Sequence, residues 1–108
     1  MINDIINELR DKKLVILGFG REGQATYKLI RKHLPDKDIC IRDKNQGIKD
    51  HELLKDDNHI IYELGDDYLD NLDKFDLILK SPGIAFNTID ITSFKDNISS
   101  ELELLLKF

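Results

Sequence analysis

The sequence contains a single cysteine, Cys40, so no disulfide bond can form within the chain. Small secreted domains depend on several such cross-links, and this chain is therefore not a disulfide-stapled scaffold. Cys40 stands between two isoleucines, and we expect it to be a buried and inert thiol. The apolar runs, of which Leu14 to Leu17 is typical, are far shorter than the roughly 20 residues that span a bilayer.

Basic residues are also in short supply. The chain has 16 lysines and arginines against 21 acidic residues, for a net charge of -5. This balance argues against a nucleic-acid partner and against an anionic membrane surface. It does not exclude anionic small molecules, because backbone N–H groups can hold a phosphate inside an acidic protein.

The beginning of the sequence lacks the basic stretch and long apolar segment of a secretory signal peptide, so we expect a cytoplasmic protein. With 108 residues, 41% of them hydrophobic and 34% charged, the chain fits one domain with its own core, spanning residues 1–108. The three histidines lack the spacing of a helical metal pair. The aspartates between residues 56 and 76 do not form a calcium-binding loop, and they indicate a solvated acidic face. We expect no metal site.

Apolar residues recur with helical spacing in some segments and as short β-branched runs in others. The pattern predicts strands at 14–17, 38–42, 60–62, 77–80 and 97–99. It predicts longer helices at 2–10 and 21–34, short helical segments at 51–55, 67–72 and 91–96, and a helix beginning at Ser100 with Glu103 in a capping box. Alternating strands and helices indicate an α/β, Rossmann-like fold: a parallel five-stranded sheet in the order 3-2-1-4-5 with helices on both faces.

A glycine-rich loop lies between the first strand and the helix that follows it. The loop reads Gly18, Phe19, Gly20, Arg21, Glu22, Gly23, which is the pattern G-x-G-x-x-G. Such glycines permit a tight turn, the approach of backbone to a diphosphate, and close packing of the helix on the strand. The helix N-terminus adds unpaired N–H groups and a partial positive charge. We predict that the loop binds phosphate; the alternative is a glycine turn used only for packing.

Asp43 ends the second strand, twenty positions after the last glycine of the loop. In dinucleotide-binding domains an acid at this place hydrogen-bonds a ribose hydroxyl. The alternative is a solvated aspartate at a strand end. From these residues alone the ligand is a nucleotide diphosphate, with NAD as the default.

Two further segments point to a particular family. Ser81, Pro82, Gly83 and Ile84 follow the fourth strand, and a Glu-Leu-Glu-Leu segment begins at Glu101. Together with the glycine loop, and in this order, they resemble signatures of the Mur ligases, most closely those of the branch that adds D-glutamate. The resemblance runs from about Lys13 to Phe108.

The resemblance implies that this domain binds UDP-N-acetylmuramoyl-L-alanine in place of NAD. Carried over by position, Phe19 to Glu22 lie against the diphosphate, Asp43 and Lys44 face the uridine end, and Ser81, Pro82 and Gly83 form the opposite wall. Glu22 stands where the family often has a small hydroxyl residue. A carboxylate beside a diphosphate is unfavourable, so Arg21 is the better phosphate contact.

The ligases of this family also use ATP and Mg²⁺, which these residues do not provide for. The phosphate-binding loop G-x-x-x-x-G-K-[ST] is missing, since the only Lys-Ser pair, Lys80 and Ser81, lacks the preceding glycines. We expect no cofactor in this chain and no ligation by it alone, with the ATP-binding and C-terminal domains of the ligase as its missing partners. An NAD(H)-binding domain remains the alternative, and an α/β domain that binds nothing is a third.

Overall fold

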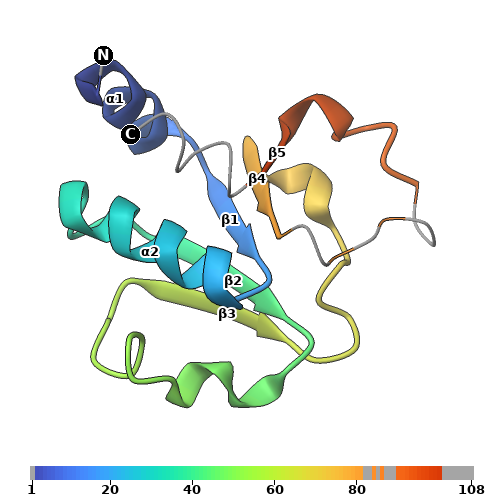
Figure 1. The fold of residues 1–108 in the computed structure, drawn as a ribbon. Coiled ribbons are helices and arrows are strands. Elements are labelled where there is room, and N and C mark those ends of the chain that lie inside the picture. Colours follow the sequence, from blue (N-terminus) through green and yellow to red (C-terminus); the bar gives the residue numbers. More distant parts are fainter. Residues whose placement is uncertain (1, 82–83, 85, 87–89, 101–108) are drawn as a thin grey trace.

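The computed structural model describes residues 2–81, 84, 86 and 90–100; within this range, the side chains of residues 2–5 and 100 are not described. Five parallel strands form one sheet in the order β3-β2-β1-β4-β5, which confirms the predicted fold class and strand order (Figure 1). The strands are β1 (Leu14–Leu17), β2 (Ile39–Asp43), β3 (Ile60–Leu64), β4 (Leu77–Lys80) and β5 (Ile98–Ser100). The helices are α1 (Ile2–Asp11), α2 (Arg21–His33) and the 3-10 helices η1 (Gln46–Asp50), η2 (Leu72–Lys74) and η3 (Lys95–Asn97).

The side chains of β1 alternate between two hydrophobic cores, one on each face of the sheet. Leu14 and Ile16 belong to the first core, and Val15 and Leu17 to the second. All four are at most 1% exposed, because β1 is the central strand and pairs with β2 on one side and β4 on the other. A short apolar run without polar alternation is the sequence of such a strand.

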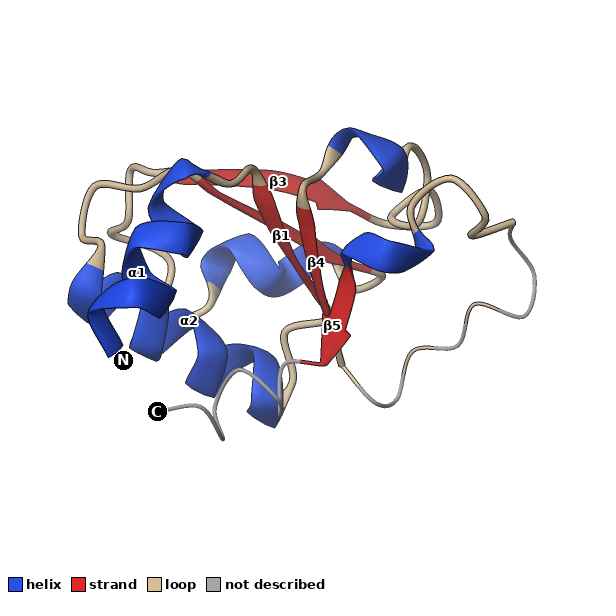
Figure 2. Cartoon of the chain, turned by 90° about the horizontal axis from the view of Figure 1, so that it is seen from above, coloured by secondary structure: helices blue, strands red, loops and turns tan. Residues whose placement is uncertain are grey.

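Both α-helices cover the first core. Ile6 and Leu9 of α1 and Tyr27 and Ile30 of α2 are buried there, at helical spacing along each helix. In Figure 2 the two helices lie together to the left of β1 and β4.

The second core is covered by short elements. Leu72 and Phe75 of the β3–β4 connection and Phe94 of the β4–β5 connection close it. The predicted covering of both faces is therefore confirmed, with 3-10 helices on this face.

The short helical segments predicted from the sequence differ from those observed. Residues 52–56 form hydrogen-bonded turns next to η1, residues 66–71 form turns before η2, and residues 92–94 form turns before η3. Local side chains stabilise such turns: Asn45 accepts a hydrogen bond from the Gly47 N–H, and Asp90 accepts one from the Thr92 N–H. Segments of about five residues are also too short to overcome the cost of helix nucleation. The helix predicted from Ser100 lies outside the described residues, except that Ser100 itself ends β5.

Candidate functional site

The carboxyl ends of β1 and β4 meet where the strand order reverses, the usual position of a ligand crevice in a parallel sheet. Two backbone hydrogen bonds hold the segments together beyond the strands. The Gly18 N–H donates to the Arg42 carbonyl over 2.8 Å, and the Ser81 N–H donates to the Leu17 carbonyl over 3.1 Å. The predicted glycine loop and the predicted Ser81 wall are therefore neighbours in space.

Gly18 is required here for two reasons. Its φ of +91° lies in the region that side chains disfavour. A Cβ atom at this position would also lie 2.7 Å from Ile84 Cδ1 and 3.1 Å from Ser81 Cβ. The glycine thus lets the loop after β1 pack directly against the segment after β4.

The side chain of Phe19 packs in the hydrophobic core. Its ring is 2% exposed and makes edge-to-face contacts with Tyr27 and His51, with centroids 5.9 and 5.3 Å apart. Its N–H donates to Asp43 Oδ2 over 2.8 Å. Phe19 was predicted to be part of the phosphate loop, and its side chain is buried in the first core.

Gly20 is the exposed N-cap of α2, and its carbonyl accepts the first helical bond, from the Gln24 N–H over 2.9 Å. Among the described residues, no side chain caps this helix end, and apart from the two chain neighbours none has an atom within 4 Å of where a Gly20 Cβ would be. Arg21 is exposed, Glu22 is half-buried and Gly23 is buried. The described residues therefore leave the N-terminus of a 13-residue helix uncovered at Gly20, an arrangement suited to an anion.

Asp43 joins three strand ends. Its Oδ2 accepts from the Phe19 N–H, its Oδ1 accepts from the Asn45 N–H over 2.8 Å, and its carbonyl accepts from the Gly65 N–H over 3.0 Å. Gly65 makes the last bond with a φ of +101°. The Asp43 carboxylate, which was predicted to contact ligand, therefore also holds the glycine loop in place through its bond to the Phe19 N–H.

Two of the remaining predicted residues, Lys44 and Ser81, directly follow β2 and β4 at the same edge of the sheet. Lys44 is exposed beside Asp43, and Ser81 is half-buried, with its carbonyl accepting from the Ile84 N–H over 3.1 Å. Pro82 and Gly83 lie outside the described residues. In the part of the chain that the structure describes, no group of three or more potential ligands could hold a metal ion, and no helix is long and apolar enough to cross a membrane.

The sequence of the chain is similar to those of known ligases. The chain is 28% identical over 111 residues to UDP-N-acetylmuramoylalanine--D-glutamate ligase of Acetivibrio thermocellus, and 30% identical over 95 residues to the ligase of the same name from Ligilactobacillus salivarius. These matches cover 98% and 85% of the chain. The chain belongs to the Mur ligase family.

The Mur ligase chain spans only 23% and 20% of the length of these two relatives. It is also 28% identical over 80 residues to UDP-N-acetylmuramoyl-L-alanine--L-glutamate ligase of Xanthomonas oryzae pv. oryzae, covering 74% of the chain and 17% of that protein. No protein-family profile matches the chain, and no solved structure does. The resemblance identified from Gly18 to Gly23, Ser81 to Ile84 and the segment at Glu101 is confirmed at the level of the family.

In this Mur ligase chain, sequence analysis missed a buried arginine beside the crevice. Arg42 is 0% exposed and faces the second core, where it pairs with Glu63, donates to the Asp70 carbonyl and stacks 5.1 Å from the centroid of the Phe75 ring. Its Nε has no hydrogen-bond partner among the described residues. A charged residue in an otherwise apolar strand is the signal that could have found it. Arg42 fixes the β3–β4 connection over the end of β2.

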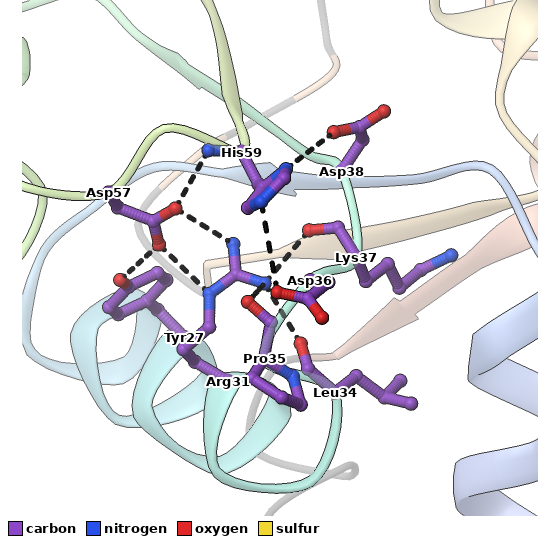
Figure 3. Close-up of polar contacts among 9 residues, drawn as sticks. All are labelled: Tyr27, Arg31, Leu34, Pro35, Asp36, Lys37, Asp38, Asp57 and His59. Carbon is purple, nitrogen blue, oxygen red and sulfur yellow. Dashed lines mark hydrogen bonds and ion pairs between the residues drawn. The ribbon is translucent and has the colours of Figure 1, made fainter.

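A second missed cluster lies at the other end of the sheet (Figure 3). Arg31 of α2 donates to Asp57 through Nε at 2.8 Å and Nη2 at 3.3 Å, and its Nη1 donates to the carbonyls of Leu34, Pro35 and Lys37. The Tyr27 hydroxyl donates to the same Asp57 carboxylate over 2.5 Å. The cluster therefore ties α2 to the segments that lead into β2 and β3.

These contacts shift the pKa values of both partners of the hydroxyl–carboxylate bond. Burial alone would raise the pKa of Asp57, but hydrogen bonds from Tyr27 and the His59 N–H, together with the Arg31 charge, hold it below 3.8. Burial, followed by the bond to Asp57, raises the pKa of Tyr27. At neutral pH the cluster consists of a carboxylate, a neutral phenol and a guanidinium.

Proposed function

We propose that this chain binds UDP-N-acetylmuramoyl-L-alanine, as the N-terminal domain of a ligase that adds D-glutamate during peptidoglycan precursor synthesis in the cytoplasm. One observation carries the proposal: in a relative of these ligases, no described residue caps or covers the N-terminus of α2 at Gly20, just after the end of β1. Two of the relatives described above are D-glutamate ligases by name, and a third is an L-glutamate ligase. The proposal that D-glutamate is the added amino acid follows the names of the first two relatives.

The diphosphate has the strongest structural support. The N–H groups at the start of α2 and the side chain of Arg21 supply donors and positive charge around Gly20. The Phe19 N–H is already bonded to Asp43, so the diphosphate contacts begin at Gly20 and not one residue earlier. Glu22, half-buried at the same helix end, is an unfavourable neighbour for a diphosphate, and Arg21 beside it in the sequence carries the opposite charge.

The other assignments rest on position. Asp43 and Lys44 face the uridine end, and Ser81, Pro82 and Gly83 form the opposite wall. Each Asp43 oxygen accepts one hydrogen bond within the protein and keeps a further acceptor position, so the residue can also serve a ligand.

Ligation requires groups that this chain does not supply. ATP with Mg²⁺ activates a carboxylate for attack by an amine, and it needs a lysine-containing phosphate loop and a metal site. The sequence has no such loop, and the described residues form no metal cluster. We therefore propose that the chain binds substrate without catalysing its ligation, and that ATP-binding and C-terminal domains complete the enzyme.

Calorimetric titration tests the proposal directly. UDP-N-acetylmuramoyl-L-alanine and UDP should give saturable heat, and NADH should give none. Binding of NADH alone would replace the proposal with the alternative of a nicotinamide-binding domain, which Asp43 does not exclude.

A substitution at the glycine loop locates the ligand. Gly20→Val should abolish UDP binding while leaving the fold intact, because the side chain enters the open space at the helix end. The backbone at Gly20 is extended, with φ -77° and ψ -156°, and its negative φ does not require glycine. Gly47→Ala, at another exposed glycine in η1, is the matched control and should bind UDP normally. Unchanged UDP affinity in Gly20→Val would refute the phosphate-loop assignment.

A further inference from the structure

A cavity of about 710 Å³ lies at the end of the sheet opposite to the crevice. It is bounded by the α1–β1 connection, the segment before β2, and the second face of β2 and β3 near Cys40 and Ile61. Its volume is within the range of sites that hold small organic molecules. None of the residues assigned to the UDP ligand lines it.

The floor of this cavity is apolar. Leu14, Cys40 and Phe75 are at most 4% exposed, and Ile61 extends the apolar surface to the edge of the sheet. Ile61 is 51% exposed, and no other large apolar side chain in the described part of the chain is exposed. An apolar floor that stays open at this edge is suited to the body of a ligand.

The rim of the cavity is basic, in contrast to the chain as a whole. Five lysines and arginines line it against three acidic residues, in a chain of net charge -5. The basic residues are Arg10, Lys12, Lys13, Lys37 and Lys74. An anion at this site is attracted by the local charge even though the overall charge repels it.

Several of these charges are fixed at the cavity. Lys13 Nζ and Lys74 Nζ lie 5.8 and 5.4 Å from the centroid of the Phe75 ring. Lys37 Nζ donates to the carbonyls of Arg10 and Lys12, at 3.0 and 2.7 Å, which uses two of its three protons. Glu63, one of the three acidic residues of the lining, forms ion pairs with Arg42 and Lys74.

We propose that this cavity is a second binding site, separate from the UDP crevice, for an organic anion that carries an apolar body. The body lies against Ile61, the exposed part of the apolar lining, and the anionic group lies among Lys13, Lys37 and Lys74. Charge complementarity selects an anion over a neutral molecule of the same shape, and the apolar floor selects an organic anion over a simple inorganic one.

Naphthalene-1-sulfonate is a suitable probe, with the neutral naphthalene-1-methanol and inorganic sulfate as comparisons. Titrations of the whole chain are followed by ¹H–¹⁵N NMR. The sulfonate should shift the amides of Lys13, Lys37 and Ile61, and bind at least tenfold more tightly than either comparison. UDP, titrated separately, should shift the amides of Gly20 and Arg21. Loss of binding at one site can therefore be distinguished from loss of binding at the other.

Variants test whether the sulfonate binds in this cavity. Lys13→Gln combined with Lys74→Gln should weaken the sulfonate at least tenfold, and Ile61→Glu should abolish its binding; the exposed position of Ile61 allows the fold to survive the change. Lys28→Gln combined with Lys55→Gln, at exposed positions outside the cavity, is the matched control and should bind normally. Equal affinity for the sulfonate and the methanol, or unchanged binding in Ile61→Glu, would overturn the proposal. So would a dimer in analytical ultracentrifugation that Ile61→Glu dissociates, because a second copy would then be the occupant.

Discussion

Replacement of Arg31 by methionine should be among the most destabilising changes to a charged residue of this chain. Methionine keeps much of the length and apolar stem of arginine but removes every hydrogen-bond donor. Five hydrogen bonds are lost, two to Asp57 and three to backbone carbonyls. The Arg31 and Asp57 side chains are only 16% and 10% exposed, so water replaces these bonds poorly.

Two opposing effects set the size of the expected loss of stability. Breaking a fully buried ion pair costs about 3–5 kcal/mol. Asp57 keeps the bonds from Tyr27 and the His59 N–H, which reduces the cost. We therefore expect a loss of about 2–4 kcal/mol of unfolding free energy, comparable to breaking one or two charged hydrogen bonds. In a domain of this size that lowers Tm by roughly 10–20 °C.

The assay is urea unfolding followed by far-UV circular dichroism, for Arg31→Met, Asp57→Asn and the double variant. The double-mutant cycle should give a coupling free energy of about 1 kcal/mol or more between these two side chains. Lys32→Met, at the exposed neighbouring position of α2, is the control and should change stability by less than about 0.5 kcal/mol. If Arg31→Met is as stable as Lys32→Met, the cluster in Figure 3 does not contribute to stability and the reasoning fails.

Three further outcomes are expected. Gly18→Ala should lose about 1–3 kcal/mol in the same urea assay, because alanine at φ +91° is strained and its Cβ meets Ile84; a stability equal to wild type would show that this loop relaxes freely. Ile16→Ala, in a strand position that is 0% exposed, should lose about 2–5 kcal/mol, and a loss below 1 kcal/mol would mean that the first core collapses around the cavity. Because folding depresses the pKa of Asp57, its contribution is present above the unfolded value of 3.8 and is lost as pH falls through the lower folded value. Urea midpoints measured from pH 6 down to pH 2 should therefore fall more for wild type than for Asp57→Asn, and parallel curves would contradict the assigned shift.

The strands that flank the crevice were predicted with the bounds observed. β1 and β4 are apolar runs that end in Gly18 and in Ser81 followed by proline and glycine, so their ends are marked in the sequence itself. Strand β3 was predicted two residues too short, because Glu63 looks like the end of an apolar run. The partner that accounts for Glu63, Arg42, lies 21 residues away and is invisible to a local pattern.

The candidate site, too, could be predicted from local sequence patterns only in part. The glycine loop could be located from its spacing, and the structure places it beside Ser81 as expected. The role of Phe19 could not be predicted, since a loop residue becomes part of the core only through Tyr27 and His51. The hydrogen bond from the Phe19 N–H to Asp43 joins the ends of β1 and β2. It forms because these strands pair in the sheet, and no sequence motif predicts it.

The position of β1 has a consequence for how the domain can be divided. This one strand supplies two side chains to each core and pairs with a neighbour on both sides. A break in any connection after β1 leaves it in the N-terminal fragment, and the other fragment then lacks the central element of both cores. A split version of the domain would therefore assemble only by docking the second fragment onto β1, and neither half would hold a native sheet before the two meet.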